Sequence, residues 1–326
     1  MDGHAVRLPY AGVGLDRLAV RRKDDAAVAA LFAHDATRLV PMWGERSFLA
    51  ADSSAPNAQR PPLTPALRAA MRAARIDAAL LGVREDGSAL FAADLAPLAD
   101  GEREALLGPG TFQPLRDMRT RIGEADLALL GYARALLHWH RTTGYCAMCG
   151  APTRSAEAGH VRACPNEHLH YPRINPAVIM LVTSPVGEPP RCVLGRHGGL
   201  PPHMYSTLAG FVEPGESLEE TVAREVAEEV GLRVDAIVYQ ASQPWPFPAQ
   251  LMIGFHAQAA VAPLHVDPAE LDDARWFSLE EVRAFGEAGD PDARFTLPRR
   301  DSVARYLVER WMERYAGERP RPSTAP

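Results

Sequence analysis

The sequence predicts an α/β protein with more than one domain. Its 326 residues are enough for about two domains at roughly 150 residues each. Hydrophobic residues make up 47% and charged residues 23%, which is typical of a folded globular chain and argues against a disordered or coiled-coil one. Short β-branched runs and helical patterns both occur along the chain, so strands and helices are both expected.

The first part of the chain shows a hairpin and a long helix. Residues 79–84 and 89–93 are apolar runs that flank an Asp-Gly dipeptide, which is typical of a tight hairpin turn. Between 124 and 139, apolar residues recur at helical spacing and predict a helix that leads into a cluster of cysteines. His138 and His140 lie at the end of this helix, where we interpret them as solvated groups or partners of the helix dipole rather than metal ligands.

The second part of the chain begins with a buried strand. The run 176–182 is short, β-branched and bounded by proline. Cys192 falls in the next expected strand, 191–195, and is therefore interpreted as a packing thiol rather than a nucleophile. The remaining expected elements are a helix over 218–230, strands around 234–239 and 251–256, and a last helix over 302–315.

Charge and composition argue against several function classes. The net charge of −6 gives no overall attraction to nucleic acid or anionic lipid, so RNA binding has to be argued from a local site. Lys23 is the only lysine, which argues against a lysine Schiff base and a Walker-type phosphate lysine. No apolar stretch approaches the ~20 residues that cross a bilayer, and the first residues lack the apolar segment of a secretory signal. We therefore expect a cytoplasmic protein without a membrane span.

The segment 210–232 specifies a helix by both of its ends. A Pro-Gly turn precedes the helix, and Ser217 with Glu220 has the pattern of a capping box. Gly231 suits a left-handed residue at the C-terminal end. The helix boundaries are therefore predicted by local chemistry as well as by periodicity.

Glutamates gather on one face of this helix. Glu225 and Glu229 are four residues apart and lie on the same face, with Glu228 beside them. Like charges at this spacing repel, and such a cluster is tolerated where a divalent cation neutralises it. Carboxylate oxygens suit Mg²⁺ or Mn²⁺. An ordinary solvated acidic face is the alternative for glutamates without further pattern.

The complete pattern of the segment favours the metal interpretation. Glycine, five residues, glutamate, seven residues, then Arg-Glu-apolar-x-Glu-Glu-x-Gly-apolar resembles the Nudix box at every specified position from Gly210 to Leu232. This resemblance implies the Nudix α/β/α sandwich with a mixed sheet, and hydrolysis of a nucleoside diphosphate linked to another group. It also implies that water attacks phosphorus with the help of bound metals, and that Arg224 orients the carboxylates through ion pairs.

The resemblance also implies which residues carry the reaction. The expected catalytic residues are Glu225, Glu228 and Glu229. Glu229 is the best candidate to orient or deprotonate water through its metal. The implied metal ligands are Ala209 through its main chain, Glu216, Glu225, Glu228, Glu229 and Glu270. Glu270 comes from an acidic segment before an Ala-x-Trp-Phe strand, and an exposed loop acid is its alternative interpretation.

A proline-interleaved aromatic run, 242–248, follows the box. A rigid loop in which Trp245 and Phe247 cap the core is one interpretation, since proline fixes φ and removes an amide donor. The run also resembles the signature of the NADH pyrophosphatase branch of Nudix hydrolases, although this chain has Gln250 where the family has serine. The resemblance implies a substrate site formed by Gln243, Pro244, Trp245, Pro246, Phe247, Pro248, Ala249 and Gln250, with Ala304 on the last helix and Arg116 in the N-terminal domain.

Two further aromatic residues match positions that sandwich a base in this family. They are Tyr171, in a Tyr-Pro-Arg sequence, and Phe211, directly after Gly210. The resemblance implies that they do so partly across a dimer interface. Core packing is the alternative for both.

The cysteine cluster resembles the zinc ribbon that precedes the catalytic domain in this family. Three thiolates of a tetrahedral Zn²⁺ site would come from Cys146, Cys149 and Cys164. The family's fourth cysteine is missing, and His168 is the expected substitute, with His170 and then Glu167 as alternatives. Loss of zinc, with the ribbon held by packing alone, stays open. Redox chemistry at the CxxC pair is disfavoured because nothing resembling a thioredoxin strand precedes it.

These observations lead to a predicted activity. We expect a Mg²⁺- or Mn²⁺-dependent NAD(H) diphosphatase that forms AMP and nicotinamide mononucleotide from NADH or NAD⁺, works as a homodimer, and also removes NAD caps from RNA 5′ ends. A local basic track for RNA would use Arg294, Arg299, Arg300 and Arg305. The alternatives are a broader dinucleotide pyrophosphatase and a non-catalytic nucleotide-sensing or RNA-binding module, and the intact acidic box argues against the second.

The expected domain organisation has four parts. They are an N-terminal α+β domain over 1–140, a zinc-ribbon-like segment over 141–173, a Nudix hydrolase domain over 174–316, and a disordered tail over 317–326.

Overall fold

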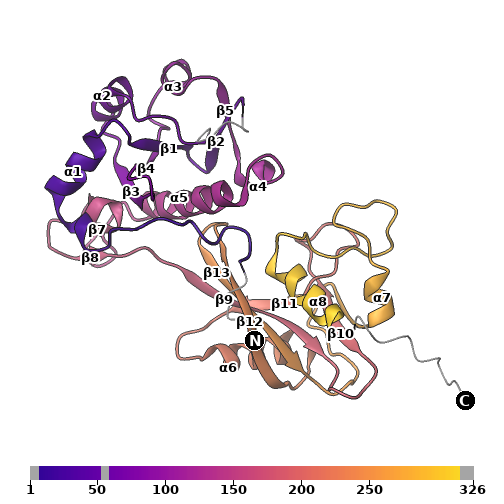
Figure 1. Ribbon diagram of the computed structural model, residues 1–326. Helices are drawn as coiled ribbons and strands as arrows, with labels where there is room; N and C mark the ends of the chain where they lie inside the picture. The colour runs from indigo at the N-terminus through magenta and orange to yellow at the C-terminus, as the bar shows by residue number, and fades with distance from the viewer. Residues whose placement is uncertain (1–6, 53–58, 316–326) are drawn as a thin grey trace, which may run out of the picture. The chain divides into compact units, whose positions relative to one another are not determined.

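The computed structural model describes residues 7–52 and 59–315, which form two units (Figure 1). The C-terminal unit contains residues 175–243 and 251–315, together with residues 7 and 8. The N-terminal unit contains residues 9–174 and also 244–250, a short segment that we call the hairpin tip. The tail expected over 317–326 lies outside the described residues.

A mixed sheet of five strands forms the centre of the N-terminal unit. The strand order is β3-β4-β1-β2-β5, with β1 parallel to β4 and the other neighbours antiparallel. The predicted hairpin is confirmed as β3 and β4, and Gly87 in its turn has a φ of +81°. The strands are β1 (Arg38–Trp43), β2 (Arg46–Ala50), β3 (Ala78–Val83), β4 (Ala89–Asp94) and β5 (Gly110–Pro114).

Helices cover both faces of this sheet. Leu90 and Ala92 of β4 face α5, whereas Phe91 and Ala93 pack with α1 and α2 on the other face. This alternation follows from the period of two residues along a strand. The helices of the unit are α1 (Asp25–Ala33), α2 (Pro65–Ala73), α3 (Asp100–Leu107), α4 (Leu115–Met118) and α5 (Glu124–Thr142). The long helix expected from residue 124 onward is therefore confirmed as α5.

A small antiparallel sheet follows α5 in the same unit. It consists of β6 (Arg154–Ala156), β7 (Val161–Ala163) and β8 (Leu169–His170), in that order. The four predicted zinc ligands lie before and between these strands. We call residues 144–171 the ribbon.

The C-terminal unit contains a six-stranded sheet. Its order is β12-β13-β9-β10-β14, and β11 pairs with β9. The strands are β9 (Asn175–Thr183), β10 (Arg191–Arg196), β11 (Leu208–Phe211), β12 (Asp235–Trp245), β13 (Gln250–Gln258) and β14 (Asp273–Ser278). The predicted strands at 176–182 and 191–195 are confirmed as β9 and β10, and Cys192 is fully buried in the core, as expected for a packing thiol.

Two helices sandwich this sheet. Val178 and Met180 of β9 pack in the core beneath α6 (Leu218–Val230), whereas Ile179 and Leu181 pack in the core beneath α8 (Val303–Glu313). The short helix α7 (Leu279–Arg283) follows β14. The predicted α/β/α sandwich is confirmed. Within the described part of the chain, no helix combines the length and the apolar character that crossing a membrane requires.

Candidate functional site

Helix α6 begins and ends where the sequence predicts. The hydroxyl of Ser217 accepts a hydrogen bond from the backbone N–H of Glu220 at 3.2 Å, and the Glu220 carboxylate accepts one from the backbone N–H of Ser217 at 2.7 Å. This reciprocal pair is the predicted capping box. Gly231 ends the helix with a φ of +72°. The helix is therefore held rigidly in the register that places its glutamates.

Three carboxylates meet at one side of α6. Glu225, Glu229 and Glu270 each offer an oxygen, and these oxygens lie within 4.8 Å of one another. Glu225 and Glu229 are only 7% and 6% exposed. One oxygen of Glu229, Oε2, is buried and has no hydrogen-bond partner among the described residues. A buried carboxylate oxygen without a partner is costly, so this atom is suited to bind a cation.

Electrostatics in the cluster support the same interpretation. Burial, followed by the charges of Glu225 and Glu270, raises the pKa of Glu229 to about 8. Burial also raises the pKa of Glu225. Carboxylates that are crowded and desolvated in this way hold their protons unless positive charge is supplied. Their hard oxygen atoms fit a divalent cation such as Mg²⁺ or Mn²⁺.

Arg224 organises the acidic residues around this cluster. Its guanidinium donates to Glu225 and Glu228, each at 2.8 Å, and to Glu216 at 2.6 Å. The hydrogen bond from Arg224 and a second from the backbone N–H of Glu213 lower the pKa of Glu216 to about 2. Arg224 therefore forms the orienting ion pairs that the resemblance implies. Glu216 and Glu228 lie beside the three-carboxylate cluster with Arg224 between them, and their role as metal ligands stays a prediction.

Strand β11 presses against the cluster through a glycine. A Cβ atom added at Gly210 would lie 1.8 Å from the carboxylate carbon of Glu225, which is much closer than two non-bonded atoms can approach. The backbone N–H of the neighbouring Ala209 donates to the Glu229 carboxylate, and the carbonyl oxygen of Phe211 accepts from Arg224 at 2.9 Å. The backbone of residues 209–211 thus contacts Glu225, Glu229 and Arg224.

The hairpin tip packs its aromatic side chains into the N-terminal unit. The Trp245 and Phe247 rings are 5.3 Å apart edge to face, and each contacts Tyr10, at 5.9 Å and 5.6 Å between ring centroids. The Arg116 guanidinium carbon lies 4.2 Å from the centroid of Phe247. The resemblance implies both Arg116 and the aromatic run as substrate contacts, and the structure brings them together. Both rings stay partly exposed, so they cap a core and remain accessible.

The other predicted substrate residues have different environments. Gln243 is fully buried: its side chain donates to the carbonyl of Asp301 and accepts from the backbone N–H of Val303, each at 2.8 Å, and so anchors the start of α8. Ala304 is also buried, at 5% exposure. Of the remaining positions in the run, Pro244 and Pro248 are exposed, Pro246 is buried, and Ala249 and Gln250 are partly exposed.

Tyr171 and Phe211 belong to different units and are both exposed, at 60% and 52%. Core packing is therefore not their role within the described residues. Exposed aromatic rings of this kind suit base stacking, which stays a prediction.

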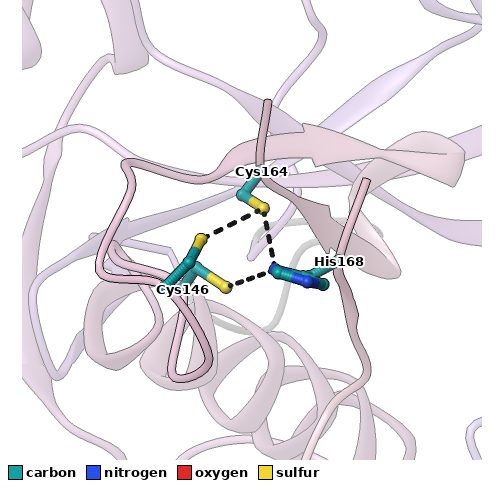
Figure 2. Close-up of side chains that lie close together, drawn as sticks. Cys146, Cys164 and His168 are labelled. Atoms are coloured by element: carbon teal, nitrogen blue, oxygen red, sulfur yellow. Dashed lines mark hydrogen bonds between the residues drawn. The ribbon is translucent and has the colours of Figure 1, made fainter. Parts of the chain in front are cut away.

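The ribbon gathers the four predicted zinc ligands. One atom from each of Cys146, Cys149, Cys164 and His168 lies within 4.8 Å of the other three. His168 Nδ1 is 3.5 Å from Cys146 Sγ and 3.6 Å from Cys164 Sγ, and Figure 2 shows these groups turned toward one another. Two tight turns place them: the N–H of Gly150 bonds to the carbonyl of Cys146, and the N–H of Glu167 bonds to that of Cys164.

The surroundings of Cys149 suit a thiolate ligand, whereas burial raises the pKa of the Cys146 thiol. Hydrogen bonds from the backbone N–H of Ala151, from Asn166 and from His168 lower the pKa of Cys149 to about 6. Asn166, whose amide lies 3.4 Å from Cys149 Sγ, was not predicted, although its position two residues after Cys164 was a visible signal. Of the alternatives, His170 Nε2 lies 3.2 Å from Cys146 Sγ but is outside the four-ligand group. Glu167 occupies the left-handed position of its turn, at φ +62°.

Two other predictions concern residues outside these clusters. His138 bonds to Glu45 at 2.9 Å and His140 to the carbonyl of Gly159 at 2.6 Å, so each histidine is held by a hydrogen bond to a distant part of the chain rather than being a solvated group at the helix end. The arginines of the expected RNA track are largely paired with acids. Arg299 lies 3.6 Å from Asp301, Arg300 and Arg305 both contact Glu287, and Arg294 lies over the ring of Phe295.

Comparisons with known proteins agree with this geometry. Three family models match the chain: a NUDIX domain over 173–297, an NADH pyrophosphatase-like rudimentary NUDIX domain over 36–139, and an NADH pyrophosphatase zinc ribbon domain over 141–171. The chain is 42% identical over 259 residues to the protein named NAD(P)H pyrophosphatase NUDT13, mitochondrial, of Mus musculus, covering 73% of this chain and 72% of that one.

Bacterial proteins named NAD-capped RNA hydrolase NudC are similarly close. The protein of Mycobacterium bovis is 41% identical over 243 residues, covering 72% of this chain and 75% of its own length. That of Stutzerimonas stutzeri is 40% identical over 239 residues, covering 73% and 78%.

Proposed function

The chain belongs to the NADH pyrophosphatase family of Nudix hydrolases, and we propose from this premise that it hydrolyses the pyrophosphate of NADH and NAD⁺ to AMP and nicotinamide mononucleotide. By the same reaction it removes NAD caps from RNA 5′ ends. One observation carries the proposal: the buried carboxylates of Glu225 and Glu229 converge with Glu270 and leave one oxygen of Glu229 without a partner. A degenerate, non-catalytic Nudix module would have no reason to keep such a costly arrangement.

Glu225, Glu229 and Glu270 would hold the catalytic Mg²⁺ or Mn²⁺. When bound, divalent cations neutralise the pyrophosphate, position water and stabilise the leaving phosphate. The chain's own residues prepare this site. Arg224 holds the carboxylates of Glu225 and Glu228 at 2.8 Å, which fixes their orientation before substrate arrives. Glu229, whose Oε2 has no hydrogen-bond partner among the described residues, is the best candidate to take a proton from the attacking water.

Substrate recognition would use the aromatic residues outside the metal cluster. Trp245 and Phe247 present partly exposed faces at the hairpin tip, and Tyr171 and Phe211 are exposed rings that can stack on a base. Stacking on aromatic faces suits a dinucleotide, whose two bases are flat rings. A homodimer would bring Tyr171 of one protomer to the base held by its partner, and the dimeric state stays part of the proposal.

The ribbon would hold one structural Zn²⁺ through Cys146, Cys149, Cys164 and His168. The donor set of three sulfurs and one imidazole nitrogen suits zinc, and the four atoms already lie within 4.8 Å of one another. His168 replaces the family's fourth cysteine in this arrangement. The ion would tie the turn after α5 to the turn before β8, so zinc binding and folding of the ribbon are expected to be coupled.

Glu229→Gln tests the proposed activity. Glutamine preserves the shape of the side chain and removes the charge, so the variant should fold and lose several powers of ten in NADH turnover. Glu219→Gln is the matched control, because Glu219 is an exposed glutamate of the same helix outside the cluster. Turnover should be measured at fixed metal and salt with both NADH and NAD-capped RNA. Near-normal turnover by a folded Glu229→Gln variant would contradict the assignment.

A further inference from the structure

The hairpin tip is held in place by the N-terminal unit, and one buried arginine is central to this. Arg134 lies on α5 and is 8% exposed. Its guanidinium donates one hydrogen bond to the carbonyl oxygen of Pro246 and another to the carboxylate of Glu45. The guanidinium carbon of Arg134 also lies 5.1 Å from the centroid of the Phe247 ring. One side chain thus contacts both the backbone and an aromatic side chain of the tip.

The partner of Arg134 is itself fixed. Glu45 follows strand β1 and also accepts hydrogen bonds from Arg141 at 2.8 Å and from His138 at 2.9 Å. A carboxylate held by several donors cannot turn away, so it locks the guanidinium in its orientation. The guanidinium of Arg134 is buried whereas Glu45 is half exposed, so moving the guanidinium away from Glu45 would leave a buried positive charge unpaired.

Helix α5 is also shaped to receive the tip. Gly131 lies three residues before Arg134, on the same face of the helix. A Cβ atom at this position would lie 3.2 Å from Cγ of Pro246 and 3.4 Å from Cδ1 of Tyr10. Glycine costs helix stability, so its presence in the middle of α5 is explained by the close approach of Pro246.

We propose that Arg134 is a positioning residue for dinucleotide recognition, acting through the hairpin tip, and that the rudimentary N-terminal domain serves as the platform for this tip. The inference rests on the proposed function, because the tip carries the expected substrate contacts Trp245 and Phe247. Among the described residues of the N-terminal unit, the only group of three or more metal-ligating side chains lies in the ribbon. The sheet and helix α5 thus have a role that needs no catalytic metal: they fix the shape of a recognition loop.

Arg134→Met is the first test, made in the full-length protein. The substitution removes the hydrogen bonds from Arg134 to Pro246 and Glu45, while Arg141 and His138 still donate to Glu45. KM for NADH should rise roughly 10- to 100-fold, the range for loss of a charge-assisted hydrogen bond, and kcat should change less than about threefold. Arg103→Met is the matched control: Arg103 is also a buried arginine of the N-terminal unit that donates to a backbone carbonyl, that of Leu98, and to a carboxylate, that of Asp100, but it takes no part in the contacts of the tip, so its KM should stay within about twofold of wild type.

A double-mutant cycle separates positioning from general stability. If Arg134 acts through the tip, Arg134→Met should raise KM little further in a chain that already carries Phe247→Ala. Hydrolysis of ADP-ribose, which lacks the nicotinamide, should be affected less than that of NADH. Additive effects in the cycle, or equal losses on both substrates, would overturn the proposal.

Gly131→Ala keeps the proposal testable if Arg134→Met fails to fold. Alanine is the better helix former, but its Cβ requires Pro246 to give by a few tenths of an ångström, so KM for NADH should rise several-fold, and urea unfolding shows whether the variant is folded. An unchanged KM in folded variants at both positions, with wild type active on NADH, would refute the positioning role alone. Failure of wild type to hydrolyse NADH would instead refute the proposed function.

Discussion

Replacing Glu229 with glutamine should stabilise the metal-free protein even though it removes activity. Glu229 is 6% exposed, and burial followed by the charges of Glu225 and Glu270 raises its pKa to about 8. At neutral pH the metal-free fold must therefore either bury a poorly neutralised charge or take up a proton. Glutamine has the same shape and avoids both costs.

The direction of the pKa shift gives the sign and size of the effect. Below its ordinary pKa of 4.5 the carboxyl is protonated in both the folded and the unfolded chain. Between 4.5 and about 8 the folded chain keeps a proton that the unfolded chain releases, so stability falls as pH rises. At about 1.4 kcal/mol per pKa unit, Glu229 alone should lower the free energy of unfolding by about 2 kcal/mol between pH 6 and 8. Glu229→Gln should lack this slope.

Hydrogen exchange of the α6 amides, measured in Mg²⁺-free buffer, reports the stability of this unit directly. Wild type should lose about 2 kcal/mol of protection relative to Glu229→Gln between pH 6 and 8 once intrinsic exchange rates are corrected. Glu219→Gln, in the same helix, should follow wild type. Parallel pH profiles for wild type and Glu229→Gln would refute the electrostatic reasoning, and with it the idea that the cluster requires a cation.

Three further predictions follow from the same structure. Gly210→Ala should cost about 100-fold in turnover, because its Cβ would lie 1.8 Å from the carboxylate carbon of Glu225 and must displace that group by more than about 1 Å; wild-type turnover would contradict it. Replacing Trp245 and Phe247 together by alanine should weaken NADH hydrolysis more than ADP-ribose hydrolysis, and equal losses would indicate a structural role. Elemental analysis should find about one zinc per chain, retained when Mg²⁺ is removed by mild chelation and strongly reduced in His168→Ala; an active, zinc-free wild type would exclude the site.

Helix α6 was predictable because its signals are local. Ser217, Glu220 and Gly231 mark its ends within a single stretch of sequence, and the observed bounds, Leu218–Val230, are those expected. The first two helices were missed. Asp24 caps α1, but the Ala-rich sequence of that helix buries no residue completely and shows no clear apolar face. Thr64 caps α2 and Pro65 is its first residue, a start signal that follows directly after the prolines at 61 and 62.

Long-range partners could not be predicted in the same way. The parallel pairing of β1 with β4 joins segments separated by a helix and two strands, and nothing in either segment specifies it. Glu270 is 41 residues after Glu229 and was identified only through the resemblance. Arg134 and Pro246 are 112 residues apart, and an arginine within a helical pattern is indistinguishable from a solvated one until its partner is placed.

Product analysis tests the central claim most directly. The full-length protein should be incubated with NADH, NAD⁺, ADP-ribose and NAD-capped RNA at one metal concentration and one salt concentration. We predict AMP and reduced nicotinamide mononucleotide in equal amounts from NADH, a 5′-monophosphorylated RNA from the capped transcript, and loss of both reactions when the divalent cation is removed. Intact NADH, or release of free nicotinamide with the pyrophosphate still joined, would contradict the proposed function.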